Sequence, residues 1–403
     1  MQQLNEKAHA LLSPSASHRW LNCTPSLRLE KIFGADEGSE AALEGTIAHA
    51  LCALMLGYLK DGVMPDTIEA DIMTTLSKSE EFTKDQLDKY YCPDMWDLCL
   101  GYAEFVMDHF RIEKQSTSDA VLMIETKIDC HMYGEGMFGT TDAAIVSDEK
   151  LLIFDFKYGK GVKVDANKNT QMMIYALGNI AEYEPLYAFE DVQMTIYQPR
   201  MENITEYKST VTELKEWGDK VLRPRALDAT AGKGTYYAGD WCRFCKARVR
   251  CNAVKDTYYN IYNKYKGKDL PTMTDDEIAQ VALTAKDVKQ WFDKVAEYVL
   301  AQMKSGREYK GLKLVEGRSI RVYANPAKVA QTLLESGYCE DEIYKERELK
   351  GMTEMQKLLK KKVMDELIGD LIIKPEGAPT MVPEDDKREA IKTAQQDFEN
   401  IEI

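Results

Sequence analysis

The chain has 403 residues, 44% of them apolar and 30% charged, which suits one large domain with an appendage or two domains. Its net charge of −15 excludes a protein that coats nucleic acid through its global field, but it permits a nuclease with an acidic metal site. Nine cysteines, an odd number, do not indicate a secreted disulfide framework.

The sequence gives no sign of a membrane or export segment. No apolar run approaches the roughly 20 residues that a membrane span requires. The first residues lack the charged-then-apolar pattern of a signal peptide. We therefore expect a cytoplasmic protein without a membrane partner.

The first predicted element is a short helix near the N-terminus. Ser13 and Pro14 form a good helix start, with a hydroxyl N-cap and proline at the first helical position. The helix should end before Pro25 and leave Cys23 at its exit.

Two longer helices should follow. Residues 40–59 are rich in helix formers with a broad apolar face, which predicts a mostly buried helix. Residues 95–113 predict another helix, and the acidic stretch 62–90 predicts short helices and loops.

A change of pattern after residue 120 predicts strands. Val121–Ile128 alternates as a strand does, and Thr140–Val146 with Leu151–Lys157 predicts a hairpin. The turn before this hairpin is marked by glycines, namely Gly134, Gly136 and Gly139.

Helices and strands then alternate. Gln171–Ile180 predicts a helix, Val192–Tyr197 a strand closed by Gln-Pro, and Thr212–Arg223 a further helix. This order indicates an α/β core with a central mixed sheet.

The remainder predicts a separate region. Glycine and proline at Gly267–Pro271 suggest a boundary, so we assign one domain to residues 1–260 and a mainly helical region to 261–373. Residues 374–403 read as a tail. The elements expected after the boundary are helices at 274–304, 326–336 and 353–369 and a small strand pair around Leu312–Tyr323.

Four cysteines mark the two ends of the first domain. Cys242, Cys245 and Cys251 are closely spaced, and Cys23 lies over two hundred residues upstream. Soft thiolates at such spacing converge on one metal ion or iron–sulfur cluster, and zinc and iron–sulfur both remain open. The isolated cysteines are expected to be small buried hydrophobic residues; they are Cys52, Cys92, Cys99, Cys130 and Cys339.

The predicted hairpin carries a possible cation site. Side chains alternate along a strand, so Asp155 and Lys157 share one face while Phe154 and Phe156 enter the opposite layer. Asp142 is expected to end the preceding strand, across the hairpin. Two carboxylates beside a lysine suit a divalent ion that acts on a phosphate, although an isolated Asp-x-Lys is more often an ordinary ion pair.

Two further motifs are weak when taken alone. His49 lies on the apolar helix 40–59, where a histidine is more often a core residue than a ligand. Gln171 and Tyr175 lie one helical turn apart on the same face, as the polar edge of an amphipathic helix also would.

Two basic strips interrupt the acidic composition. One comprises Lys157, Lys160, Lys163 and Lys168; the other comprises Arg243, Lys246, Arg248 and Arg250, interleaved with the cysteines. Taken alone, each strip is typical of an ordinary solvated face.

Together these motifs resemble the PD-(D/E)XK nuclease superfamily. Gly-x-x-x-His, Gly-x-x-Asp, Asp-x-Lys, Gln-x-x-x-Tyr and Cys-x₂-Cys-x₅-Cys occur in this order. Over residues 10–255 the chain resembles the RecB-type branch with an iron–sulfur staple, as in CRISPR adaptation nucleases and AddB-type nuclease domains. The whole chain also resembles an uncharacterised phage and prophage family. Thr141-Asp142 stands where the proline–aspartate of the superfamily name would be.

The resemblance implies a fold and a set of roles. The fold would be α/β, a restriction-endonuclease-like core with a central mixed sheet flanked by helices, plus a mainly helical C-terminal region. Mn²⁺ or Mg²⁺ would be held by His49, Asp142, Asp155 and the backbone carbonyl of Phe156. Lys157 would be the catalytic lysine, with Gln171 and Tyr175 positioning it or the DNA backbone. A [4Fe-4S] cluster, or alternatively Zn²⁺, would be held by Cys23, Cys242, Cys245 and Cys251.

The implied function is a metal-dependent DNA nuclease of phage or prophage recombination or replication. It would act as an exonuclease on single-stranded or duplex DNA ends, with phage recombination or single-strand-binding proteins as further partners. Glu125 and Glu44 are candidate auxiliary acids. The alternative is a non-catalytic module that binds DNA ends or a recombinase and carries a structural Cys₄ metal site. Cleavage polarity, strand preference and oligomeric state stay open.

Overall fold

The structure is a computed structural model that forms two compact units, Met1–Thr257 and Tyr258–Ile403. It describes residues 10–33, 40–63, 65–79, 81–265, 273–313 and 325–336, and the single positions 315, 339, 367, 368, 371 and 372. The first unit carries every residue of the expected active site.

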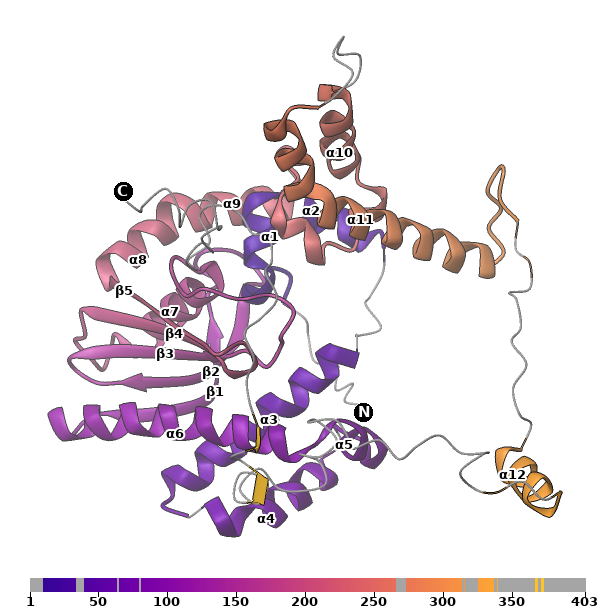
Figure 1. The fold of residues 1–403 in the computed structure, drawn as a ribbon. Coiled ribbons are helices and arrows are strands. Elements are labelled where there is room, and N and C mark those ends of the chain that lie inside the picture. Colours follow the sequence, from indigo (N-terminus) through magenta and orange to yellow (C-terminus); the bar gives the residue numbers. More distant parts are fainter. Residues whose placement is uncertain are drawn as a thin grey trace, which may run out of the picture. The chain divides into compact units, whose positions relative to one another are not determined.

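A five-stranded mixed sheet forms the centre of the first unit (Figure 1). Its order in space follows the chain, and only β3 and β4 run parallel. The strands are β1 (Val121–Asp129), β2 (Phe138–Val146), β3 (Lys150–Phe156), β4 (Asp191–Gln198) and β5 (Asn203–Thr210). The expected α/β fold with a central mixed sheet flanked by helices is confirmed.

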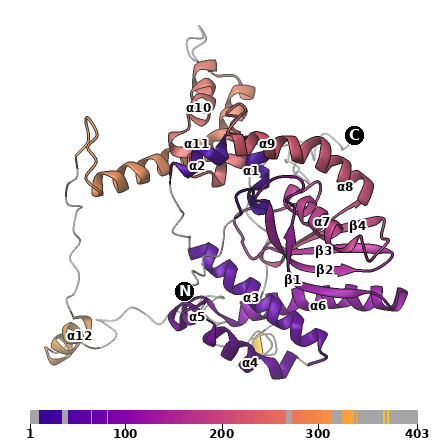
Figure 2. The same cartoon turned by 180° about the vertical axis from the view of Figure 1, so that it is seen from behind.

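Helices cover both faces of this sheet, as the two opposite views show (Figures 1 and 2). One layer contains α3 (Glu40–Lys60), α4 (Pro65–Lys78), α5 (Lys84–Tyr90) and α6 (Pro93–Ser116). The other contains α1 (Ser17–Asn22), α2 (Ser26–Lys31), α7 (Thr170–Tyr183), α8 (Val211–Trp217) and α9 (Arg223–Ala231).

Successive side chains of β3 point into two different hydrophobic cores, as expected for a strand with both faces covered. Ile153 packs into the core on the α7 side, while Phe154 and Phe156 pack into the core on the α3 and α6 side. The predicted orientation of these side chains is therefore confirmed, and it leaves Asp155 facing α7.

Helix α3 belongs to the core even though its composition suits a membrane. Its length and mean hydropathy of 1.4 satisfy the requirements of a membrane span, so the expectation that no segment does so is wrong. However, Ile47, Leu51 and Met55 are fully buried in the second core, where α3 packs against α6. A core helix of a globular domain meets the same requirements.

Some local expectations are wrong. Ser13 makes no side-chain capping bond to the 3₁₀ helix η1 (Pro14–Ala16); its hydroxyl lies 2.8 Å from that of Ser15. Gly139 lies within β2 rather than in the preceding turn, and Asp142 lies in the middle of β2 rather than at its end. Strand β5 lies where only a connection was expected, beside the edge of β4.

The helical character of the second unit is confirmed. Helix α10 (Asn252–Tyr265) crosses the division between the units, and α11 (Asp275–Lys304) and α12 (Pro326–Glu335) follow. Thr274 and Glu277 form a capping box that fixes the start of α11. The expected helix at 353–369, the strand pair at 312–323 and the tail at 374–403 fall almost entirely outside the described residues.

Candidate active site

Three acidic residues lie level with one another on adjacent strands. Ala143 of β2 pairs with Phe154 of β3, so the next residues along the two strands, Asp142 and Asp155, face each other across the hairpin. On the other side of β2, the pairs that flank Glu125 place it level with Asp142. The sheet register therefore gathers carboxylates from three consecutive strands, β1, β2 and β3.

His49 reaches this row from helix α3. Its Nδ1 lies 3.2 Å from Oδ1 of Asp142, and its ring meets Phe156 edge-on, with 5.6 Å between ring centroids. Burial lowers the pKa of His49, but the charge and hydrogen bond of Asp142 outweigh it and raise that pKa to about 9. Burial raises the pKa of Asp142, yet His49 more than offsets this and leaves that pKa below its usual value.

Asp155 is buried, with 1% of its surface exposed. Its Oδ1 accepts a hydrogen bond from Gln171 Nε2 at 3.0 Å. Its Oδ2 lies 2.9 Å from Lys157 Nζ but accepts no hydrogen bond of acceptable geometry. Burial raises the pKa of Asp155; the Lys157 ammonium opposes that rise and the Asp142 carboxylate adds to it. A buried carboxylate oxygen in this state has lone pairs available for a cation.

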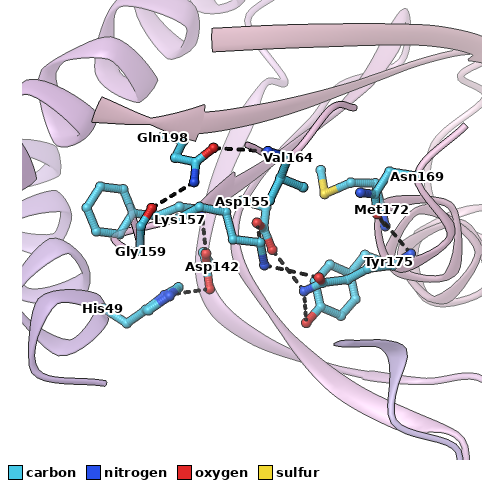
Figure 3. A network of polar contacts seen from close by, with 12 residues as sticks. His49, Asp142, Asp155, Lys157, Gly159, Val164, Asn169, Met172, Tyr175 and Gln198 are labelled. Atoms are coloured by element: carbon cyan, nitrogen blue, oxygen red, sulfur yellow. Dashed lines mark hydrogen bonds and ion pairs between the residues drawn. The ribbon is translucent and has the colours of Figure 1, made fainter. Parts of the chain in front are cut away.

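Gln171 connects the lysine, the aspartate and the tyrosine (Figure 3). Its Oε1 accepts from Lys157 Nζ at 3.0 Å, and its Nε2 lies within 3.0 Å of both Asp155 Oδ1 and the Tyr175 hydroxyl. Helix α7 starts just before it, where the Asn169 side chain caps two backbone N–H groups. The side chain that orients Lys157 thus sits on the fixed first turn of a helix.

Tyr175 is held close to the backbone of β2. A Cβ on Gly139 would lie 3.2 Å from the Tyr175 ring and 3.1 Å from Pro14, so a larger residue there would fit only if these neighbours shifted by a few tenths of an ångström. Burial raises the pKa of Tyr175, with the negative charges of Asp155 and Asp142 adding to the effect. The phenol therefore keeps its proton at neutral pH.

Gln198 is a site residue that the sequence did not single out. It is 1% exposed, and its Nε2 donates to the carbonyls of Gly159 at 2.7 Å and Val162 at 2.8 Å, while its Oε1 accepts from Val164 N (Figure 3). These bonds fix the loop that follows Lys157. The only signal in the sequence was the Gln-Pro pair that closes the strand.

Glu125, one of the two candidate auxiliary acids, lies beside His49 and Asp142. His49, Glu125 and Asp142 offer ligand atoms that all lie within 4.8 Å of one another. Glu125 has a positive φ of 49°, a left-handed conformation that is uncommon for a residue with a side chain. Asp155 instead directs its oxygens toward Lys157 and Gln171.

The remaining predicted groups are placed as follows. The N–H of Phe156 donates to Asp142 Oδ2 at 2.8 Å, which ties β3 to the carboxylate. Glu44 lies away from this set and pairs with Arg200 at 3.1 Å. The expected site residues therefore meet in one polar network, with Glu125 as an added member and Glu44 outside it.

The four predicted cysteine ligands share one neighbourhood at the end of α1. Cys23 caps that helix, Cys242 lies in the 3₁₀ helix η4 (Asp240–Phe244), and Cys251 follows η5 (Arg248–Arg250). Burial raises the pKa of the Cys23 and Cys242 thiols, and the nearby Cys251 adds to both shifts. Burial, with the carboxylate of Glu30, raises the pKa of Cys245 to about 12.

Protein contacts also join the N-terminal segment to the cysteine segment. Glu30 accepts a hydrogen bond from Lys246 N at 2.8 Å and pairs with Arg19 at 2.6 Å. Thr24 donates its hydroxyl hydrogen to the carbonyl of Lys233 at 2.6 Å. The two chain ends of the domain are thus fixed to each other by more than the cysteines.

Other residues with expected roles differ in burial. Cys52, Cys99 and Cys130 are buried as predicted, but Cys92 is only half-buried and Cys339 is exposed, so the prediction of a buried hydrophobe is wrong for the last. Arg248 is buried and therefore does not belong to a solvated face.

Comparison with known proteins gives a family and two distant structures. A family model described as a protein of unknown function (DUF2800) matches residues 9–389. The crystal structure of SSO0001 is 14% identical, with 59% of this chain and 96% of that chain covered and a TM-score of 0.23. A structure described as "Putative exonuclease" from Eubacterium rectale is 13% identical, with 71% and 99% covered and a TM-score of 0.32. Neither structural likeness carries an argument about this chain.

Proposed function

The chain belongs to the DUF2800 family of proteins of unknown function, and we propose that it is a metal-dependent nuclease that hydrolyses phosphodiester bonds at DNA ends. One observation carries the proposal. His49, Glu125 and Asp142 offer ligand atoms that lie within 4.8 Å of one another, and the strand register sets Asp155, with Lys157 paired to it at 2.9 Å, beside Asp142. Such an arrangement suits a divalent cation with a phosphate beside it.

The donor set is compatible with a divalent cation. His49, Asp142 and Asp155 would hold it, with Glu125 and the carbonyl of Phe156 as further oxygen donors. An imidazole among carboxylates favours Mn²⁺ over Mg²⁺, because Mg²⁺ prefers oxygen ligands only. When bound, the cation supplies positive charge that offsets negative charge developing on the phosphoryl oxygens.

The residues of the chain would position the reacting groups. Lys157 presents a second positive charge, fixed by Asp155 at 2.9 Å and by Gln171 at 3.0 Å. Such a fixed charge stabilises a transition state without reorganising at the moment of reaction. Tyr175 receives a hydrogen bond from Gln171 and keeps its own proton, which it can donate to a phosphate oxygen of the DNA backbone.

The cysteines would bind a structural group. Cys23, Cys242, Cys245 and Cys251 supply four soft thiol donors in one neighbourhood, which suits a [4Fe-4S] cluster or a zinc ion. Iron, sulfide and zinc analysis of anaerobically purified protein decides between the two. We place the enzyme in phage or prophage DNA recombination or replication.

A nuclease assay with the full chain tests the proposal. End-labelled single-stranded and duplex DNA are incubated with Mn²⁺, with Mg²⁺ or with EDTA, and the products are resolved on denaturing gels. Cleavage that depends on the divalent cation supports the proposal. Absence of cleavage with either cation, in a protein that is folded and binds DNA, would support the alternative of a non-catalytic DNA-end module.

We expect His49→Ala to weaken Mn²⁺ binding by roughly tenfold or more without unfolding the domain, because a ligand is lost from a half-exposed position. Isothermal titration calorimetry measures the affinity, and thermal unfolding measures the fold. If His49→Ala fails to fold, His49 is a core residue and its assignment as a ligand is wrong.

We expect Glu125→Gln to weaken Mn²⁺ binding by a smaller factor, roughly 3- to 10-fold, because one charged oxygen donor of the set becomes neutral. Glu135→Gln, a substitution away from the site, serves as the control. Equal Mn²⁺ affinity in Glu125→Gln and wild type would remove Glu125 from the cation site.

A further inference from the structure

An exposed aromatic surface lies on the cysteine segment. We call it the aromatic platform and define it as Tyr237, Trp241 and Phe244. Tyr237 is 63% exposed and Phe244 is 72% exposed. Trp241 lies between them in the sequence and is half-buried. Exposed aromatic rings that lie together, rather than singly, mark a candidate interaction site.

Two rings of the platform, Tyr237 and Trp241, pack on each other, and Phe244 lies three residues after Trp241 in the same 3₁₀ helix, where such residues share a face. Trp241 stacks on Tyr237 with 5.6 Å between centroids and an angle of 29° between planes. Its Nε1 donates to the Tyr237 carbonyl at 2.9 Å, and His18 meets its ring edge-on at 5.9 Å. A Cβ on Gly239 would lie 2.5 Å from the Trp241 ring, so the close approach of this backbone requires glycine.

Exposed basic residues lie close to the platform in sequence although the whole chain carries a charge of −15. Arg243 and Lys246 flank Phe244 in sequence, and both are exposed, as are Arg250 and Lys233. The acidic side chain nearest in sequence, Asp240, lies 3.2 Å from Nε2 of His18. This surface therefore has the local positive charge that the protein as a whole lacks.

From these features we infer that the aromatic platform binds a single strand of DNA. Unpaired bases would stack on Tyr237 and Phe244, and phosphates would contact Arg243 and Lys246; this combination is typical of single-strand binding. A duplex keeps its bases stacked inside and cannot use the rings. The inference rests on the proposed function and names the form of DNA that the enzyme takes.

Helix α1 connects the platform to the active site. Ser17 Oγ lies 2.7 Å from Thr170 Oγ1, and Thr170 directly precedes Gln171 of the active site. The next residue of α1 is His18, which contacts Trp241. Helix α1 contacts both α7 and η4, so a DNA strand bound at the platform would lie one short helix away from the helix that carries Gln171 and Tyr175.

The test measures binding by the full chain in EDTA, where no hydrolysis occurs. Fluorescence anisotropy follows a labelled oligothymidylate of about 16 nucleotides, within the usual site size. Phe244→Ala and Tyr237→Ala should each weaken binding by roughly 5- to 100-fold, since one stacking contact contributes that much. Phe244→Tyr should restore binding because it restores the ring.

Matched measurements separate this inference from a structural role of the rings. Tyr259→Ala, which removes a 55% exposed ring outside the platform, should bind as wild type does. Thermal unfolding and metal content show whether each variant keeps its fold. A folded Phe244→Ala protein with wild-type affinity would overturn the inference, as would tighter binding of duplex DNA or of RNA of matching sequence.

Failure of the inference is distinguishable from failure of the proposed function. If the protein cleaves DNA and the platform variants bind single-stranded DNA as wild type does, the nuclease proposal stands and the inferred role of the platform is wrong. If the protein binds single strands through the platform but cleaves nothing with Mn²⁺ or Mg²⁺, the nuclease proposal is wrong.

Discussion

Asp155→Asn and Lys157→Ala should each reduce cation-dependent DNA cleavage by roughly 10³-fold, because each removes charge that acts directly at the phosphate. Asp155→Asn keeps the shape of the side chain but loses the charge that would bind the cation and hold Lys157 at 2.9 Å. Lys157→Ala removes the ammonium and leaves the buried carboxylate without its ion pair. Single-turnover cleavage of end-labelled DNA measures both rates.

Lys160→Ala is the matched control for this pair. Lys160 is an exposed lysine three residues beyond Lys157, on the loop that Gln198 fixes through Gly159. We expect its loss to change cleavage by less than about threefold, as for a solvated surface charge. Equal activity in wild type, Asp155→Asn and Lys157→Ala would show that the cleavage comes from a contaminant.

If the cysteines bind the proposed cluster or zinc ion, Cys242→Ser should abolish that binding and lower the free energy of unfolding by about 3–5 kcal/mol, because metal binding at such a site contributes directly to folding. The contacts of Glu30 with Arg19 and Lys246 remain in this variant. The sheet should therefore stay folded, and mainly the segment around the end of α1 should unfold. Chemical denaturation of anaerobically prepared protein, with metal analysis, measures the effect.

Cys339→Ser provides the control, because this exposed cysteine belongs to the second unit and is not one of the four predicted ligands. Its metal content and unfolding midpoint should match those of wild type. The structural role of the cysteines would be contradicted by a Cys242→Ser protein that lacks metal and yet unfolds at the same denaturant concentration as wild type.

Local periodicity was sufficient to predict much of the fold. Alternation along β3 correctly separated Asp155 and Lys157 from Phe154 and Phe156, because both faces of that strand are buried. The apolar face of residues 40–59 and the helical spacing of Gln171 and Tyr175 likewise predicted helices that are present. These signals depend only on neighbours in the chain.

Strand β5 could not be predicted in this way. Its sequence, Asn-Ile-Thr-Glu-Tyr-Lys-Ser-Thr, is largely polar, and it is a strand because β4 offers a free edge for hydrogen bonds. The buried Gln198 is similar, since three of its four hydrogen-bond partners lie in a loop more than thirty residues earlier in the chain.

The site required long-range information as well. The residues alone left His49 as a core histidine, and only the order of the motifs placed it near Asp142. The inclusion of Glu125 depends on the register of β1 and on its left-handed backbone, neither of which periodicity reveals. The aromatic platform also depends on long-range folding, because its Trp241 ring contacts His18, more than two hundred residues earlier in the chain.

A crystal structure of the full chain soaked in Mn²⁺, with an anomalous difference map, tests the central claim most directly. We predict a manganese peak about 2 Å from carboxylate oxygens of Asp142 and Asp155 and from the His49 ring, beside Lys157. A well-ordered site that remains without a peak, or a peak that contacts none of these three side chains, would contradict the account.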